Sequence, residues 1–321
     1  MKNLKKIKYV LALDTSAYTT SLCIADTNYT ILSDSRTVLN VAQGAVGLRQ
    51  QDAFFSHIKN LGAMFEANAA MLKDISIDLV AVSEKPEARE ESYMPVFMAG
   101  YQFARALSAA FGCPLMKTTH QAGHIRACLG TNLPPDGHFK AFHLSGGTHK
   151  LLDVEISDTS ISTDVRFDTI DITAGQLIDR IGVALGYGFP AGKQVDEAAQ
   201  QSSTPFSITR PKIKSDFAFS YSGALTYLKT QLGCRNKSDI SRSLLSFIAE
   251  DILLALAKAP LLPGEVCLLS GGVSASKTIR DYLAQSALAD AIRFTPPAYA
   301  TDNAVGVAFI GADSLNKTEL I

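Results

Sequence analysis

The chain contains the stretch Phe139-Lys-Ala-Phe-His-Leu-Ser-Gly-Gly-Thr-His149, which a second apolar run from Lys150 to Ile156 follows. The apolar residues up to Leu144 predict a buried strand. The adjacent Gly146 and Gly147 predict a tight turn, because glycine adopts positive φ angles and lets the backbone approach a phosphate closely. We therefore expect a strand, a small polar turn and a returning strand.

The same order of elements is predicted at the start of the chain. Tyr9 to Leu13 is an apolar run, Asp14-Thr-Ser16 is a polar turn, and Thr20 to Ala25 alternates like a returning strand. Two hairpins with polar turns are typical of phosphotransfer proteins, in which turn amides point at phosphate oxygens.

A cluster of breaker residues separates the two hairpins. Asn132-Leu-Pro-Pro-Asp-Gly137 is the strongest such cluster in the chain. We place the domain boundary there, with one domain over residues 1–134 and a second over 135–303. A C-terminal helix over 304–321 is expected to pack back on the first domain.

Composition limits the class of protein. Of the 321 residues, 47% are hydrophobic and 19% charged, which is typical of a globular chain with a sizeable core. The net charge of −1 provides no general attraction for nucleic acid, so any RNA contact must come from a local patch or a partner. The five scattered cysteines form no Cys-x-x-Cys pair, and no apolar run approaches membrane-spanning length. These features predict a cytoplasmic protein with free thiols.

Two histidines, His120 and His124, lie four residues apart. On a helix this spacing puts both rings on one face, with Cβ atoms about 5–6 Å apart, so both can bind one metal ion. The His-x-x-x-His pattern also occurs by chance, so the spacing alone does not establish a metal site. Asp302 is a candidate third ligand, although it or Thr301 could simply cap the helix that follows. Two imidazoles and a carboxylate suit Fe(II) or Zn.

A second glycine turn, Ser270-Gly-Gly-Val273, precedes a helix predicted from Ser276 to Ala284, where amides and helix dipole favour an anion. For each Ser-Gly-Gly turn, the alternative to a phosphate-binding role is an ordinary connection between two elements. Asp179, and Asp196 at the end of a Pro/Gly loop, could bind ribose hydroxyls or could face solvent.

In their order along the chain, these motifs resemble those of the TsaD/Gcp family, the tRNA threonylcarbamoyladenosine enzymes once called O-sialoglycoprotein endopeptidases. The resemblance rests on Leu11–Ser16, His120–His124, Ser145–His149, Asp171–Asp179 with Phe189–Gly192, Phe217–Gly223, Ser270–Val273 and Thr301–Asn303. It implies an α/β protein with the actin-like ATPase (ASKHA) fold, in which two RNase H-like lobes have a cleft between them.

The resemblance also implies a site and an activity. One divalent metal, Fe or Zn, would be bound by His120, His124 and Asp302. ATP or an acyl-adenylate would be bound by Ser145, Gly146, Gly147, Thr148, His149, Asp179, Gly192, Asp196, Gly271, Gly272 and Ser276. The reaction implied is transfer of a threonylcarbamoyl group from its adenylate to N6 of an adenine in tRNA, or a related carbamoyl transfer, with the metal as a Lewis acid.

The chain departs from the family pattern at three places. Tyr18 and Thr19 replace an acidic pair, Thr148 and His149 stand in swapped order, and Ser276 replaces an asparagine. We therefore expect a divergent paralogue. The alternative is a non-catalytic scaffold that pairs with a related actin-like subunit as a homo- or heterodimer. Peptidase activity is not expected, because the His pair lacks the glutamate of a His-Glu-x-x-His motif.

Overall fold

The computed structural model describes residues 7–16, 18–40, 48–88, 91–130, 137–157, 160–210, 217–299 and 301–318. The chain divides into two compact units. Unit 1 contains Met1–Leu133, Ile156–Ser162 and Thr301–Ile321, and unit 2 contains Pro134–Glu155 and Thr163–Ala300. Most of the breaker cluster, residues 132–136, lies outside the described residues.

Unit 1 is built on a five-stranded sheet in the order β3-β2-β1-β4-β5. Its strands are β1 (Tyr9–Thr15), β2 (Thr19–Asp26), β3 (Ile31–Val38), β4 (Ile77–Lys85) and β5 (Leu115–Thr119). The first three are antiparallel, and β4 and β5 run parallel to β1. The predicted opening hairpin is β1 and β2, which pair up to Thr15 and Thr20.

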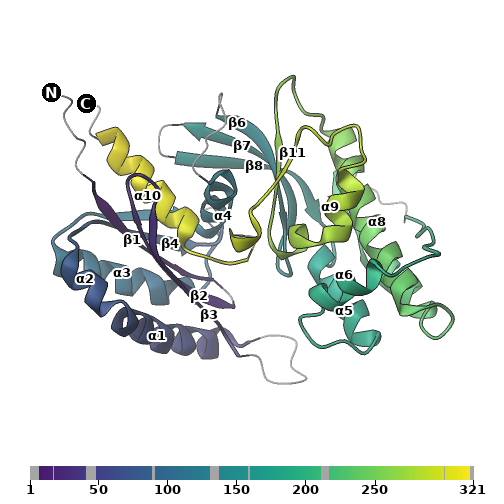
Figure 1. Ribbon diagram of the computed structural model, residues 1–321, viewed down its shortest axis with the longest axis horizontal. Coiled ribbons are helices and arrows are strands. Elements are labelled where there is room, and N and C mark those ends of the chain that lie inside the picture. The colour runs from purple at the N-terminus through teal and green to yellow at the C-terminus, as the bar shows by residue number, and fades with distance from the viewer. Residues whose placement is uncertain are drawn as a thin grey trace. The chain divides into compact units, whose positions relative to one another are not determined.

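Helices cover both faces of this sheet (Figure 1). They are α1 (Gln50–Ala67), α2 (Ala69–Asp74), α3 (Phe97–Phe111), α4 (His120–Leu129) and α10 (Val305–Thr318). Apolar side chains of β1 and β2 pack with α1 and α3 on one face, and α10 packs on β1 from the other. The helical spacing of the apolar residues from Phe54 to Phe65 predicts one helix over Gln51–Leu72. The structure has two helices there, because the Asn68 side chain donates to the Met64 carbonyl, 2.8 Å away, and ends the first.

Unit 2 is built on a six-stranded sheet in the order β11-β10-β6-β7-β8-β9. Its strands are β6 (His138–Leu144), β7 (His149–Ser157), β8 (Ser160–Thr169), β9 (Ala218–Phe219), β10 (Cys267–Ser270) and β11 (Ile292–Phe294). Its helices are α5 (Ala174–Ala184), α6 (Gly192–Ala199), α7 (Ser222–Thr230), α8 (Lys237–Lys258) and α9 (Lys277–Leu283). Apolar residues of α5 and α8 form the core with β6 and β7.

The two Ser-Gly-Gly turns lie side by side in unit 2. β6 and β10 are neighbouring parallel strands, with Ser270 paired to His143, and each turn begins where its strand ends. The carboxyl edge of parallel strands is a common ligand-binding position. The helix predicted from Ser276 to Ala284 is confirmed as α9 (Lys277–Leu283), which Ser276 caps by accepting a hydrogen bond from the Ile279 amide. A short 3₁₀ turn, η1 (Gly272–Ala275), lies between the glycine turn and this helix.

A second 3₁₀ turn, η2 (Pro297–Tyr299), precedes the return to unit 1. Within the described part of the chain, no helix has both the length and the apolar character that crossing a membrane requires.

Candidate metal centre and glycine-turn site

Three candidate ligands, His120, His124 and Asp302, converge within unit 1. The Nε2 atoms of the two histidines are 3.1 Å apart. Asp302 Oδ1 lies 3.3 Å from His124 Nε2 and 3.6 Å from His120 Nε2. One potential ligand atom from each of these three side chains lies within 4.8 Å of the other two, close enough for all three to bind a single ion.

These separations fit one small metal ion. An ion bound tetrahedrally by nitrogen and oxygen at about 2.0–2.1 Å sets neighbouring ligand atoms about 3.3–3.4 Å apart. The three distances in this cluster scatter around that value. Two imidazoles and a carboxylate also suit Fe(II) or Zn and leave coordination positions for a substrate oxygen.

The local sequence explains how the histidines are presented. Thr119 ends β5 in an extended conformation, and its side chain accepts a hydrogen bond from the Ala122 amide, which starts α4 at His120. His124 follows one turn later and is buried, whereas His120 keeps 15% of its side chain exposed. Both rings therefore face the same side of α4.

Asp302 reaches the histidines because α10 crosses α4 closely. A side chain at Gly306 would overlap the carbonyl oxygen of Gly123, so only glycine permits this approach. The capping role considered for Thr301 or Asp302 falls to Asn303, whose Oδ1 accepts from the Val305 amide at 3.0 Å. The carboxylate of Asp302 thus remains directed at the histidines.

The charges in this cluster shift two pKa values. Burial alone would lower the pKa of His120, but Asp14 and Asp302 raise it to about 9. Burial alone would raise the pKa of Asp302, but the hydrogen bond from His124 and the charges of both histidines hold it well below its usual range. The cluster therefore stabilises a carboxylate anion, the form that binds a cation.

In unit 2, the first glycine turn is closed by its own serine. Ser145 Oγ accepts hydrogen bonds from the amides of Gly147 and Thr148, at 3.2 and 2.9 Å. Gly146 and Gly147 are exposed, and a Cβ at either would meet open space. The turn thus presents exposed backbone with room for a ligand.

The start of α5 packs directly on this turn. A Cβ at Gly175 would lie 2.6 Å from the Ser145 carbonyl oxygen, and Thr173 Oγ1 donates to the Gly146 carbonyl at 2.9 Å. Thr173 also accepts from the Gln176 amide at 3.1 Å. The sequence predicts a helix from Ile172 to Leu185, and α5 begins within two residues of that start, at Thr173-Ala-Gly-Gln176, which has the spacing of a capping box.

The second glycine turn packs on the first strand of the unit. Gly271 has a φ of 86°, and a side chain there would overlap the Leu144 carbonyl, so the residue must be glycine. Gly272 is exposed. Both turns therefore present exposed glycine backbone at the same edge of the sheet.

The candidate ribose ligands are held by protein groups. Asp179 accepts a hydrogen bond from the Ala191 amide at 2.8 Å, next to the exposed Gly192. Burial raises the pKa of the Asp179 carboxyl, although this hydrogen bond acts to lower it. Asp196 accepts from Ser276 Oγ at 2.6 Å and from the Lys277 and Thr278 amides at 2.9 and 3.0 Å. Asp196 and Ser276 thus join α6 to the start of α9.

His149 lies in the core of unit 2. Its ring is fully buried among Phe142, Phe219 and Tyr221, and Nε2 lies 3.0 Å from the Tyr221 hydroxyl. Burial lowers the pKa of His149 to about 3, so the ring is neutral at pH 7. In this position His149 supports the strand that follows the glycine turn.

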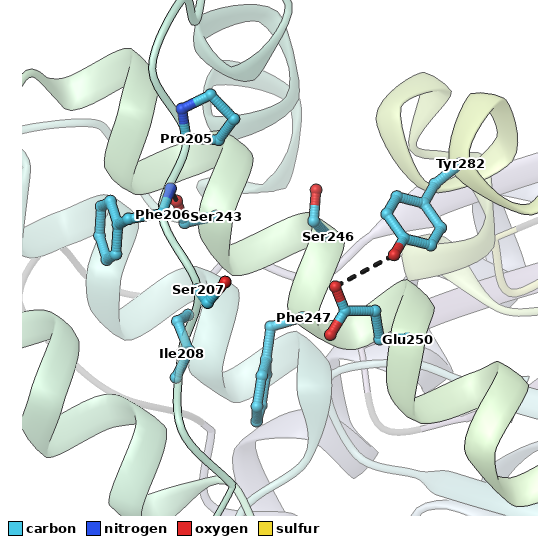
Figure 2. Close-up of a pocket in the computed structure, with 9 residues that line it drawn as sticks. All are labelled: Pro205, Phe206, Ser207, Ile208, Ser243, Ser246, Phe247, Glu250 and Tyr282. Atoms are coloured by element: carbon cyan, nitrogen blue, oxygen red, sulfur yellow. Dashed lines mark hydrogen bonds between the residues drawn. The ribbon is translucent and has the colours of Figure 1, made fainter.

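A separate hollow of about 220 Å³ lies on unit 2 between α8, α9 and the segment around Ser207 (Figure 2). Glu250 accepts from the Tyr282 hydroxyl at 3.0 Å and from Arg210 at 2.8 Å, and the Arg210 guanidinium stacks on Phe247. Both oxygens of Glu250 therefore serve to join these elements. The hollow contains none of the candidate ligands.

Comparison with known proteins gives a consistent result. Residues 41–309 match the family model described as tRNA N6-adenosine threonylcarbamoyltransferase. Curated proteins of that name from Streptococcus pneumoniae serotype 4 and Thermosipho africanus are 27% and 29% identical, over 97% and 94% of this chain and 94% and 93% of their own lengths.

Among solved structures, HypF of T. kodakarensis aligns with a TM-score of 0.64 at 14% identity, over 97% of this chain and 48% of HypF. At this identity the likeness concerns the fold alone. The expected actin-like ATPase fold is confirmed.

Proposed function

Since this chain belongs to the tRNA N6-adenosine threonylcarbamoyltransferase family, we propose that it transfers a threonylcarbamoyl group from its adenylate to N6 of an adenosine in tRNA. The observation that carries the proposal is the cluster of His120, His124 and Asp302, whose ligand atoms already have the spacing that one metal ion requires.

The proposed reaction forms one bond and breaks one. The N6 nitrogen bonds to the carbonyl carbon of the threonylcarbamoyl group, and the bond from that carbon to the phosphate oxygen breaks, so that AMP leaves with the electron pair. The proton lost by N6 passes to solvent. A metal bound by the cluster would supply Lewis-acid stabilisation of the negative charge that develops on oxygen.

For the nucleotide, we propose the glycine edge of unit 2. The exposed backbone at Gly146, Gly147 and Gly272 suits phosphate oxygens, and the start of α5 adds the positive end of a helix dipole. Asp179 and Gly192 flank one loop that a ribose could contact. His149, Asp196 and Ser276 would act indirectly, by supporting the turns and α9.

The proposal includes ATP or an acyl-adenylate as a ligand, Fe or Zn as the metal, and a cytoplasmic location, where tRNA is found. A cytoplasmic location agrees with five cysteines that are all free thiols. A related actin-like partner subunit stays a prediction.

The test compares metal content and transfer in three proteins: the wild type, His120→Ala, and His138→Ala as a control at a histidine of unit 2 that pairs with Glu265. We expect close to one equivalent of Fe or Zn in the wild type and the control. Loss of the ion in His120→Ala should slow transfer to tRNA by about 100-fold or more, because a metal supplies several kcal/mol of stabilisation. A wild type with no more metal than His120→Ala would refute the metal role. Metal-loaded protein that binds nucleotide without transfer would favour the scaffold alternative.

A further inference from the structure

The predicted polar turn, Asp14–Ser16, consists of the last two residues of β1 and the residue after it, and it lies next to the metal ligands. Asp14 is fully buried, and its Oδ1 is 3.0 Å from His120 Nδ1. The hydroxyl of Ser83 on β4 donates to the same oxygen. This carboxylate, 106 positions from His120 in the sequence, is thus held between a neighbouring strand and a candidate ligand.

The contact determines how His120 can bind a metal. A carboxylate only accepts hydrogen bonds, so His120 Nδ1 must carry the hydrogen between them. The lone pair of a neutral ring then belongs to Nε2, the atom that lies 3.1 Å from His124 Nε2. Asp14 therefore selects the tautomer in which the nitrogen facing the cluster is the ligand.

The same turn also orients the carboxylate ligand. Ser16 Oγ donates to Asp302 Oδ2 at 3.0 Å. The other oxygen, Oδ1, faces the histidines at 3.3 and 3.6 Å. Ser16 thereby favours one-oxygen coordination by Asp302.

Thr15 fixes the turn between these two contacts. Its Oγ1 donates to the Val96 carbonyl at 3.0 Å and accepts from the Gly100 amide at 3.1 Å. A Cβ at Gly100 would lie 2.9 Å from that hydroxyl, so α3 approaches Thr15 closely because residue 100 is glycine. The turn is therefore attached to both the sheet and α3.

We propose that Asp14 and Ser16 are positioning residues for the metal, each holding one ligand through a single hydrogen bond: Asp14 selects the ligating nitrogen of His120, and Ser16 selects the ligating oxygen of Asp302. The proposal rests on the proposed metal site. The sequence predicts phosphate contacts for the backbone amides of this turn, and the proposal gives its side chains a separate role.

The test measures Zn²⁺ affinity of the full-length metal-free protein by competition with a chelator. Asp14→Ala should bind Zn²⁺ about 10–100-fold more weakly, the usual cost of removing such a partner. Asp14→Asn should lose less, because an amide oxygen still accepts from Nδ1. Ser16→Ala should lose about 2–10-fold, the equivalent of one net hydrogen bond.

Asp26→Ala is the matched control, since Asp26 is also a buried carboxylate at a hairpin end of the same sheet, where it accepts from the Asn28 and Thr30 amides. It should keep the wild-type affinity. Imidazole ¹⁵N NMR of the Zn²⁺-loaded wild type gives a second measurement that needs no variant to fold: His120 should carry hydrogen on Nδ1 and metal on Nε2.

Asp14→Ala with wild-type affinity, or metal on His120 Nδ1, overturns this inference and leaves the proposed function standing. If Asp14→Ala does not fold, Asp14→Asn and Ser16→Ala decide, and wild-type affinity in both overturns it. A wild type that binds no Zn²⁺ overturns the metal site together with this inference.

Discussion

At the scale of single residues, two histidines have opposite properties. The pKa of His120 is raised to about 9, because Asp14 and Asp302 outweigh its burial. The pKa of His149 is lowered to about 3, because burial among aromatic rings meets no opposing carboxylate. The groups that face each ring therefore decide whether it can take part in an ionic cluster or belongs to the core.

His149 should make the protein less stable in mild acid. An unfolded histidine has a pKa of about 6.5, so below that pH the unfolded chain binds a proton that the folded chain excludes. Stability is complete above pH 6.5 and falls with pH by about 1.4 kcal/mol per unit toward the folded pKa. Urea unfolding at pH 7 and pH 5 measures this loss.

The comparison protein is the double variant His149→Phe with Tyr221→Phe, which removes both hydrogen-bonding partners and leaves no buried polar atom unpaired. The double variant should lose about 2 kcal/mol less between pH 7 and pH 5 than the wild type. His138→Ala, at a more exposed ring, should behave like the wild type. Equal pH dependence in wild type and double variant would contradict a neutral His149.

At the scale of elements, the crossing of α4 and α10 brings the metal ligands together. Gly306→Ala would drive a methyl group into the Gly123 carbonyl and force the helices apart. We expect a loss of about 1–3 kcal/mol in the free energy of unfolding, typical of overpacking, and weaker Zn²⁺ binding because Asp302 moves with α10. Urea unfolding and chelator competition measure the two effects.

Gly62→Ala in α1 is the control, since a Cβ there would meet nothing within 4 Å. Alanine is the better helix former, so this variant should be unchanged or more stable by up to about 1 kcal/mol. If Gly306→Ala unfolds and binds Zn²⁺ as Gly62→Ala does, close helix approach is not what positions Asp302.

The elements that sequence predicts well are those with local signals. Glycine pairs after apolar runs predicted both turns of unit 2, and the spacing of His120 and His124 predicted a shared helix face. β3 was missed, because this strand mixes polar and apolar residues without clear alternation. β8 was missed although it carries a local signal: Ile161, Val165 and Phe167 lie on one face, and polar residues alternate with them. The break at Asn68 was missed because it depends on one side chain bonding to its own helix.

Contacts between distant residues could not be predicted in the same way. Nothing near Asp14 in the sequence indicates that its partner is His120, because the fold alone brings β1 and α4 together. Likewise, the sequence predicts that Asp196 ends a Pro/Gly loop that fits a ligand, whereas Asp196 lies in α6 and accepts three hydrogen bonds from the start of α9. Residue type and spacing therefore predict candidate chemistry, and tertiary packing determines which candidates have protein partners.

At the scale of the whole molecule, the candidate ligands are divided between two units. The metal ligands and their supporting turn belong to unit 1, whereas the glycine turns belong to unit 2, and each unit has its own apolar core. Each unit should therefore bind its own ligand when the other site is disabled, although transfer requires both. Metal and nucleotide binding can then be removed separately.

Two variants test this separation. His120→Ala should lose Zn²⁺ and keep ATP affinity to within about twofold. Gly147→Asp places a negative charge at an exposed position with room for a side chain, where repulsion of about 1–4 kcal/mol should weaken ATP binding about fivefold or more. Its Zn²⁺ affinity should not change, and Gly147→Ala should bind both ligands normally. Calorimetry with each ligand measures both affinities of every variant. Loss of both ligands in either variant would show that the two sites do not form independently, while undiminished ATP binding by Gly147→Asp would remove the glycine turn from the nucleotide site.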